Sequence, residues 1–114
     1  MLQVTWRGMA ESDALATLIR TRFVKLYRFH RRILGCRVLI EQPHHHQHAG
    51  EHVRVRIDLS VPGQELVVDR EPAEGAAHED AYVAVREAFN AMRRQLEDYV
   101  RVRRGFTKTH APAP

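Results

Sequence analysis

Residues 79–104 read EDAYVAVREAFNAMRRQLEDYVRVRR and have the periodicity of one long amphipathic helix. At about 100° per residue, one face of this helix is apolar and carries Val85, Phe89, Met92, Leu96 and Tyr99. A different face carries Arg86, Arg93 and Arg104, with Arg94 and Arg101 beside them and Tyr82 on the border between the two faces. The helix is therefore predicted to bury one face against a sheet. Its flank presents arginines, whose planar guanidinium groups match the geometry of phosphate.

Four further segments are predicted to be strands, over residues 2–6, 36–41, 53–61 and 65–70. Residues 53–61 alternate most regularly between apolar and polar, which indicates a strand with one buried and one polar face. Pro62 and Gly63 follow this strand and suit the central positions of a type II turn, because Pro fixes φ and Gly accepts a positive φ. The last two strands are therefore expected to form a hairpin.

A second helix is predicted from Asp13 to about Ile33. Ser12 occupies the N-cap position, and Asp13 lies in the first turn, where the helix dipole favours negative charge. Gly35 is expected to stop the helix. The apolar residues that recur at helical spacing are Leu15, Ile19, Phe23, Leu26 and Ile33.

The order β-α-β-β-β-α predicts an α+β fold, a two-layer sandwich in which both helices pack on one face of a four-stranded mixed sheet. The first two strands should be parallel, joined by a right-handed crossover, and the others antiparallel. We expect one domain over residues 1–104 and a flexible C-terminal tail over residues 105–114, because FTKTHAPAP after Gly105 has no periodicity and two prolines.

Composition narrows the possible partners. The 114 residues include 18 Lys and Arg against 14 Asp and Glu, giving a net charge of +4 and a pI near 9.8. That pI fits a nucleic-acid-binding protein, and equally a basic protein without such a partner. The lone Cys36 excludes an intramolecular disulfide and is expected to be a small buried hydrophobe. No signal-peptide core or membrane-length apolar stretch is present, so we expect a cytoplasmic protein without a membrane partner.

The position of the basic residues favours phosphate binding. Residues 1–34 contain seven basic residues against two acidic ones, a bias that a solvated helix face does not require. Arg20, Arg28 and Arg31 lie opposite the apolar stripe of the first helix, and Arg22 and Lys25 lie beside it. Long arginine stems covering apolar surface are the alternative explanation for Arg20 and Arg28.

The sequence gives weaker support to metal binding and to catalysis. The loop with His44, His45, His46 and His48, followed by His52, suggests metal binding, but the spacing matches no zinc signature and no Cys is near. The sequence contains no glycine-rich phosphate loop and no nucleophile paired with a base at a usable spacing. We therefore expect no catalytic residue, no cofactor, no metal and no small-molecule substrate.

Several side chains have two readings. Arg54 and Arg56 could contact RNA or pair with Asp58 or Glu65 on the sheet, and in a protein-protein module they would contact a partner. Tyr82 could border the core, contact RNA, or do both. The aromatic residues expected in the core are Trp6, Phe23, Phe29 and Phe89.

Three motifs together carry a family resemblance: DALATLIRTRFVKLYRF in the first helix, VRIDLSVPGQELVV across the hairpin and EDAYVAVREAFNAMRRQLEDY in the last helix. Over residues 2–104 the chain resembles the hibernation-promoting factor and ribosome-associated inhibitor family. The resemblance implies the same β-α-β-β-β-α domain, placed in the mRNA channel and decoding site of the small ribosomal subunit, where it blocks initiation and stabilises idle ribosomes. It also implies a protein without catalytic activity that is a monomer when bound to the ribosome. The chain resembles the short form, without a C-terminal dimerising domain.

The resemblance also implies which residues contact rRNA. Arg22 and Lys25 match basic positions of the family's first helix, and Tyr82 and Arg94 match its last-helix motif. Where relatives often carry lysines, this chain has Ala91, Asp98 and Val100, so neighbouring arginines are expected to substitute. The predicted RNA-binding residues are Arg22, Lys25, Arg28, Arg31, Arg32, Tyr82, Arg86, Arg93, Arg94, Arg101 and Arg104.

Overall fold

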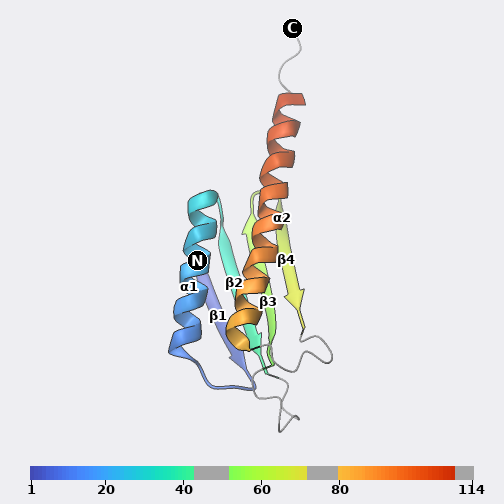
Figure 1. Cartoon of the computed structure of the whole chain (residues 1–114). Helices are drawn as coiled ribbons and strands as arrows, with labels where there is room; N and C mark the ends of the chain where they lie inside the picture. Colours follow the sequence, from blue (N-terminus) through green and yellow to red (C-terminus); the bar gives the residue numbers. More distant parts are fainter. Residues whose placement is uncertain (43–51, 72–79, 110–114) are drawn as a thin grey trace.

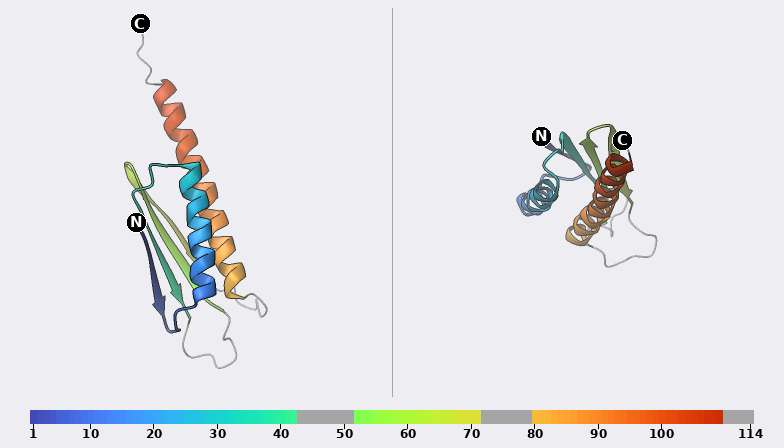
Figure 2. Two further views of the ribbon diagram at one scale, coloured as in Figure 1. Left: turned by 90° about the vertical axis from the view of Figure 1, so that its left-hand side faces the viewer. Right: turned by 90° about the horizontal axis from the view of Figure 1, so that it is seen from above.

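A computed structural model describes residues 1–42, 52–71 and 80–109, with side chains up to Gly105. Six elements follow one another: β1 (Leu2–Arg7), α1 (Asp13–Phe29), β2 (Gly35–Glu41), β3 (Arg54–Val61), β4 (Gln64–Arg70) and α2 (Ala81–Thr109). Both helices lie on the same face of the sheet (Figures 1 and 2). The predicted α+β sandwich is confirmed.

The strands lie in the sheet in chain order, β1-β2-β3-β4. β1 and β2 are parallel and the other two pairs are antiparallel. The register aligns Val4 with Val38, Val38 with Ile57, and Ile57 with Val68, so one apolar row crosses the sheet on the side of the helices. The opposite side, called the open sheet face below, carries the alternate residues of each strand, which are mostly polar.

The first helix begins as predicted and ends early. The Ser12 hydroxyl accepts a hydrogen bond from the Leu15 amide at 3.2 Å. The helix ends at Phe29 because His30 takes an extended backbone conformation, with φ −142°. Ile33 is still buried, but the chain reaches that position by turning back toward β2, and the predicted end near Ile33 is wrong.

The second helix is longer than predicted. Its start is capped by Asp80, whose Oδ1 accepts a hydrogen bond from the Val83 amide at 2.9 Å. Gly105 does not stop it, because this residue avoids the left-handed conformation that ends many helices, and the helix continues to Thr109. Residues 105–109, which were predicted to begin a flexible tail, are helical in the structure, and the flexibility of the tail stays a prediction. Figure 1 shows α2 projecting well past the sheet.

Two glycines fit tight turns. Gly8 has φ 73°, and a Cβ there would lie 2.4 Å from the Gln42 carbonyl oxygen, so the loop after β1 needs glycine. Gly63 has φ 87°, as expected for a type II turn between β3 and β4.

The core between the sheet and the helices is apolar. The predicted α2 stripe is buried, with Val85, Met92 and Leu96 at 0% exposure. Cys36 is buried as predicted, and burial raises the pKa of its thiol to about 12. Phe29, predicted to be in the core, is 39% exposed, because the helix ends there and its ring faces α2 from outside.

Candidate nucleic-acid interface

A small groove between the two helices brings together basic residues from both. Its volume is about 90 Å³. Leu26 and Phe89 are buried and form its apolar base. The polar residues that line it are Arg22, Lys25, Asn90 and Arg93. Three predicted RNA-binding cations thus meet in what we call the helix groove, although α1 and α2 are far apart in the sequence.

Arg93 is the most tightly held side chain of this groove. Its guanidinium carbon lies over the Phe29 ring, 4.1 Å from the ring centroid. Its Nε donates a hydrogen bond to Glu97 Oε2 at 3.0 Å, one turn further along α2. Arg22 and Lys25 form no ion pair with an acidic residue of the described ranges, so their charges are available to a ligand.

Other predicted contacts lie along α2. Arg86 is two turns before Arg93 and half-buried, which places both on the same side of the helix. Tyr82 is 39% exposed and lies outside the core. Arg94 is exposed and forms no salt bridge with a described acidic residue, whereas Arg101 pairs with Asp98 at 2.6 Å. Arg104 is exposed on the projecting part of the helix.

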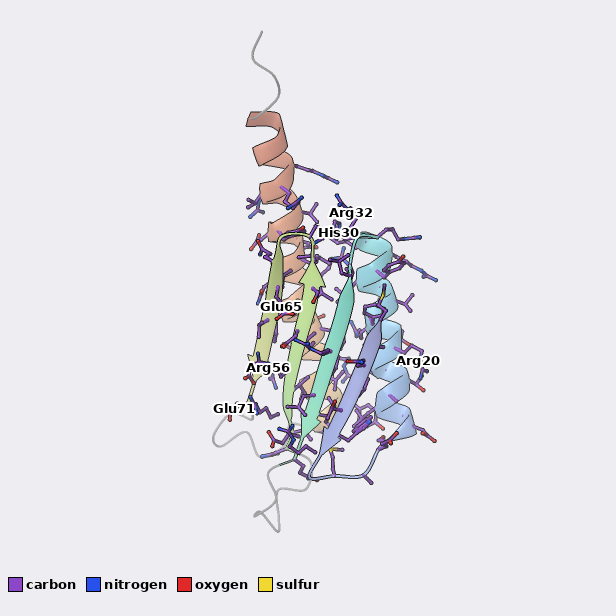
Figure 3. The ribbon with its side chains drawn as sticks, turned by 180° about the vertical axis from the view of Figure 1, so that it is seen from behind. Arg20, His30, Arg32, Arg56, Glu65 and Glu71 are labelled. Carbon is purple, nitrogen blue, oxygen red and sulfur yellow. The ribbon has the colours of Figure 1, made fainter. Side chains whose placement is uncertain are left out.

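A second basic cluster forms where α1 ends against α2. The His30 ring meets the Tyr99 ring edge-on, with the centroids 5.7 Å apart. Burial, and then the charges of Arg32 and Arg103, lower the pKa of His30. Arg31 lies over the Tyr27 ring at 5.4 Å. Figure 3 shows His30 and Arg32 together at this end of the molecule. Arg28 is also exposed near the end of α1.

Arg103 belongs to this cluster although the predicted set omits it. Its guanidinium carbon lies 5.4 Å from the Tyr99 ring centroid, and its Nη1 donates to the Pro62 carbonyl at 3.3 Å. The spacing of four residues from Tyr99 is the sequence signal that places both side chains on one side of a helix.

The open sheet face is electrically balanced, unlike the helix side. Arg54 bonds Asp69 at 2.7 Å and Glu41 at 3.0 Å, and these bonds raise the pKa of the guanidinium. Arg56 bonds Asp58 at 2.8 Å, which is one of the alternatives that the sequence left open. Glu65 pairs instead with Arg37, which sequence reasoning missed because it lies in an apolar run. Figure 3 views this face, with Arg56 and Glu65 labelled.

The described strand residues that point to this face include four arginines and four carboxylates. The arginines are Arg7, Arg37, Arg54 and Arg56, and the carboxylates are Glu41, Asp58, Glu65 and Asp69. By contrast, residues 13–34 contain six basic residues and one acidic one. The uncompensated positive charge therefore lies on the side of the helices.

The remaining predictions concern metal and membrane. His44, His45, His46 and His48 lie outside the described residues, and His52 lies just before β3. Among described residues, no group of three or more His, Cys, Asp or Glu is arranged to hold a metal ion. Neither described helix has the length and apolar character needed to cross a membrane.

Comparison with solved structures shows the same fold elsewhere. The N-terminal domain of Protein Y from Thermus thermophilus has a TM-score of 0.66 and 22% identity, over 85% of this chain and 94% of that one. A ribosomal subunit interface protein from Coxiella burnetii has a TM-score of 0.68 and 18% identity, over 86% and 94%. Comparison with curated proteins gives no match. The family model described as sigma 54 modulation protein / S30EA ribosomal protein matches residues 2–104, and the chain belongs to this family.

Proposed function

We propose that this protein is a cytoplasmic, ribosome-associated translation inhibitor of the hibernation-factor type. In this proposal it binds the small ribosomal subunit and its rRNA in the decoding site and mRNA channel, through the basic side of its two helices. Membership of a family described as ribosomal, and a structural neighbour described as a ribosomal subunit interface protein, support a ribosomal partner.

The observation that carries the choice of surface is the difference in charge between the two faces. Arg22, Lys25 and Arg93 meet in the helix groove, whereas Arg37, Arg54 and Arg56 of the open sheet face pair with carboxylates of the same face. Arg22 and Lys25 have no ion pair with a described acidic residue, and Arg93 bonds Glu97 through Nε alone, so these cations can neutralise phosphates and release the counterions of a polyanion. RNA is therefore expected on the helix side, and Arg54 and Arg56 are expected to stabilise the sheet.

The side chains on the helix side suit phosphate contacts better than base stacking. The Arg93 guanidinium occupies one face of the exposed Phe29 ring, which leaves the ring less available to stack on a base. Folded rRNA is recognised largely through its shape and backbone phosphates, for which arginine is well suited. Catalysis has no part in this proposal, since binding alone would obstruct the channel.

Two matched triple variants test the choice of surface. Arg86/Arg93/Arg94→Ala removes three charges from α2, and Arg37/Arg54/Arg56→Ala removes three from the open sheet face. We expect the first variant to weaken co-sedimentation with small ribosomal subunits. The slope of log K against log salt should become less steep by about one for each phosphate that is no longer neutralised. The second should bind like the wild type, once circular dichroism confirms that it is folded. Unchanged co-sedimentation of the α2 variant at every salt concentration would place the interface elsewhere.

Placement in the channel needs a separate test. Small subunits loaded with mRNA and initiator tRNA should exclude the wild-type protein, because the ligands would occupy the same volume. Equal affinity for loaded and empty subunits would rule out the channel while leaving ribosome binding intact.

A further inference from the structure

Arg93 is held from both α1 and α2. The Phe29 ring, at the last residue of α1, covers its guanidinium at 4.1 Å, and Glu97 accepts the Nε hydrogen at 3.0 Å. A long arginine side chain normally samples many rotamers in solution. Two contacts from different elements restrict this one before any ligand arrives.

These contacts leave free the part of the Arg93 guanidinium that would bind a phosphate. Arginine has five N–H donors, and the bond to Glu97 uses only the one on Nε. The two terminal nitrogens keep four donors, and the side chain lines the helix groove beside Arg22 and Lys25. The guanidinium carbon lies over the Phe29 ring, and the Arg93 side chain remains 41% exposed.

The Phe29 side chain is not part of the hydrophobic core. Its side chain is 39% exposed, more than expected for a large aromatic that serves only packing. Glu97 interrupts the arginines of α2 and would by itself repel a phosphate. Its bond to Arg93 provides a reason for a carboxylate in that position.

We propose that Phe29 and Glu97 are positioning residues that hold Arg93 at the seam between the helices, ready to bind one RNA phosphate together with Arg22 and Lys25. This inference rests on the proposed function and adds to it the residues that prearrange the contact. An exposed cation–π contact of this kind corresponds to about a two- to five-fold change in affinity.

A double-mutant cycle tests the role of Phe29, with small ribosomal subunits as the ligand. Phe29→Ala should weaken binding about two- to five-fold and lower the salt slope toward that of Arg93→Ala. In an Arg93→Ala background the same change should have no further effect. Phe29→Trp, which keeps an aromatic face, should restore binding. Val24→Ala is the matched control, because Val24 is 37% exposed on the same helix and offers no aromatic face to an arginine.

A second cycle tests Glu97. Glu97→Gln removes a repulsive charge but also loosens Arg93. It should therefore strengthen binding more in an Arg93→Ala protein than in the wild type. Equal gains in both backgrounds would show that Glu97 acts only as a nearby negative charge, and would overturn its positioning role.

The outcomes separate this inference from the proposed function. If Arg93→Ala weakens binding but Phe29→Ala does not, or if Phe29→Ala weakens it equally without Arg93, positioning by Phe29 is wrong and the interface stands. If Arg22→Ala, Lys25→Ala and Arg93→Ala all bind like the wild type, the helix groove is not the interface, and the positioning role is overturned with it.

Discussion

His30 shows how the positive charge on the side of the helices affects a residue beneath it. Its Nε2 is buried and has no hydrogen-bond partner among the described residues. The Tyr99 ring covers it from α2, and Arg32 and Arg103 lie near it. Burial and these two cations disfavour the protonated imidazole and lower the pKa of His30.

This shift predicts a pH dependence of stability. In the unfolded chain His30 takes up a proton near its ordinary pKa of 6.5, while in the folded protein it stays neutral to lower pH. The free energy of unfolding should therefore fall as the pH drops below about 6.5. Urea denaturation of the wild type and His30→Gln from pH 7.5 to 5.5 measures this. The wild type should lose more stability over that range than the variant, whereas parallel curves would show that His30 does not contribute.

Single side chains also show what the sequence could not reveal. Helical periodicity places Arg22, Lys25 and Arg93 on helix surfaces, but their meeting depends on how α1 packs beside α2. The pairing of Arg54 with Asp69 depends on the register of β3 and β4, which the alternation pattern alone does not set. The prediction of a core position for Phe29 is wrong, because this residue is the last of α1 and its exposed ring packs against Arg93.

Among the elements, α2 is tied to the hairpin by one buried hydroxyl. Tyr99 is 6% exposed, and its phenol donates a hydrogen bond to the Pro62 carbonyl at 2.6 Å. Tyr99→Phe should lower the free energy of unfolding by about 0.5–1.5 kcal/mol, because the short phenol hydrogen bond is lost and the Pro62 carbonyl keeps only the longer bond from Arg103. Tyr82→Phe is the control, since Tyr82 is exposed. Equal stability of Tyr99→Phe and the wild type in urea denaturation would contradict this contact.

A separate prediction concerns the projecting end of α2. Gly105 lies inside the helix, and a Cβ added there meets no atom within 4 Å. Gly105→Ala should therefore stabilise the last turns by about 0.5–1 kcal/mol through helix propensity. Slower amide exchange at residues 101–105 and a stronger helical circular dichroism signal would show this. Unchanged exchange would mean that the helix ends before Gly105 in solution.

Periodicity predicts elements more reliably than their ends. Residue patterns predicted every element that the structure describes: apolar stripes predicted α1 and α2, regular alternation predicted β3, and the segments 2–6, 36–41 and 65–70 were predicted as the other strands. The predicted helix ends were wrong where the backbone conformation of a single residue decides where the helix stops. His30 leaves the helix without a glycine or proline, and Gly105 remains helical although glycine commonly follows a helix end.

For the whole molecule, the two faces have different electrostatic roles. On the open sheet face, Arg37, Arg54 and Arg56 form ion pairs with carboxylates of β2, β3 and β4, and the helix side keeps Arg22 and Lys25 unpaired with described acidic residues. A modest net charge of +4 can thus support a strongly basic surface. The sequence indicated a basic protein, but only the sheet register shows that one face is neutral.

The salt dependence of affinity for small ribosomal subunits tests this account most directly. The measurement compares the wild type, Arg22/Lys25/Arg93→Ala and Arg37/Arg54/Arg56→Ala over a range of salt concentrations. The plot of log K against log salt should be less steep for the groove variant by about one for each phosphate left without its cation, up to about three, and unchanged for the open-face variant. A wild-type slope retained by the groove variant, or a reduced slope for the open-face variant, would contradict the claim that the helix groove binds rRNA.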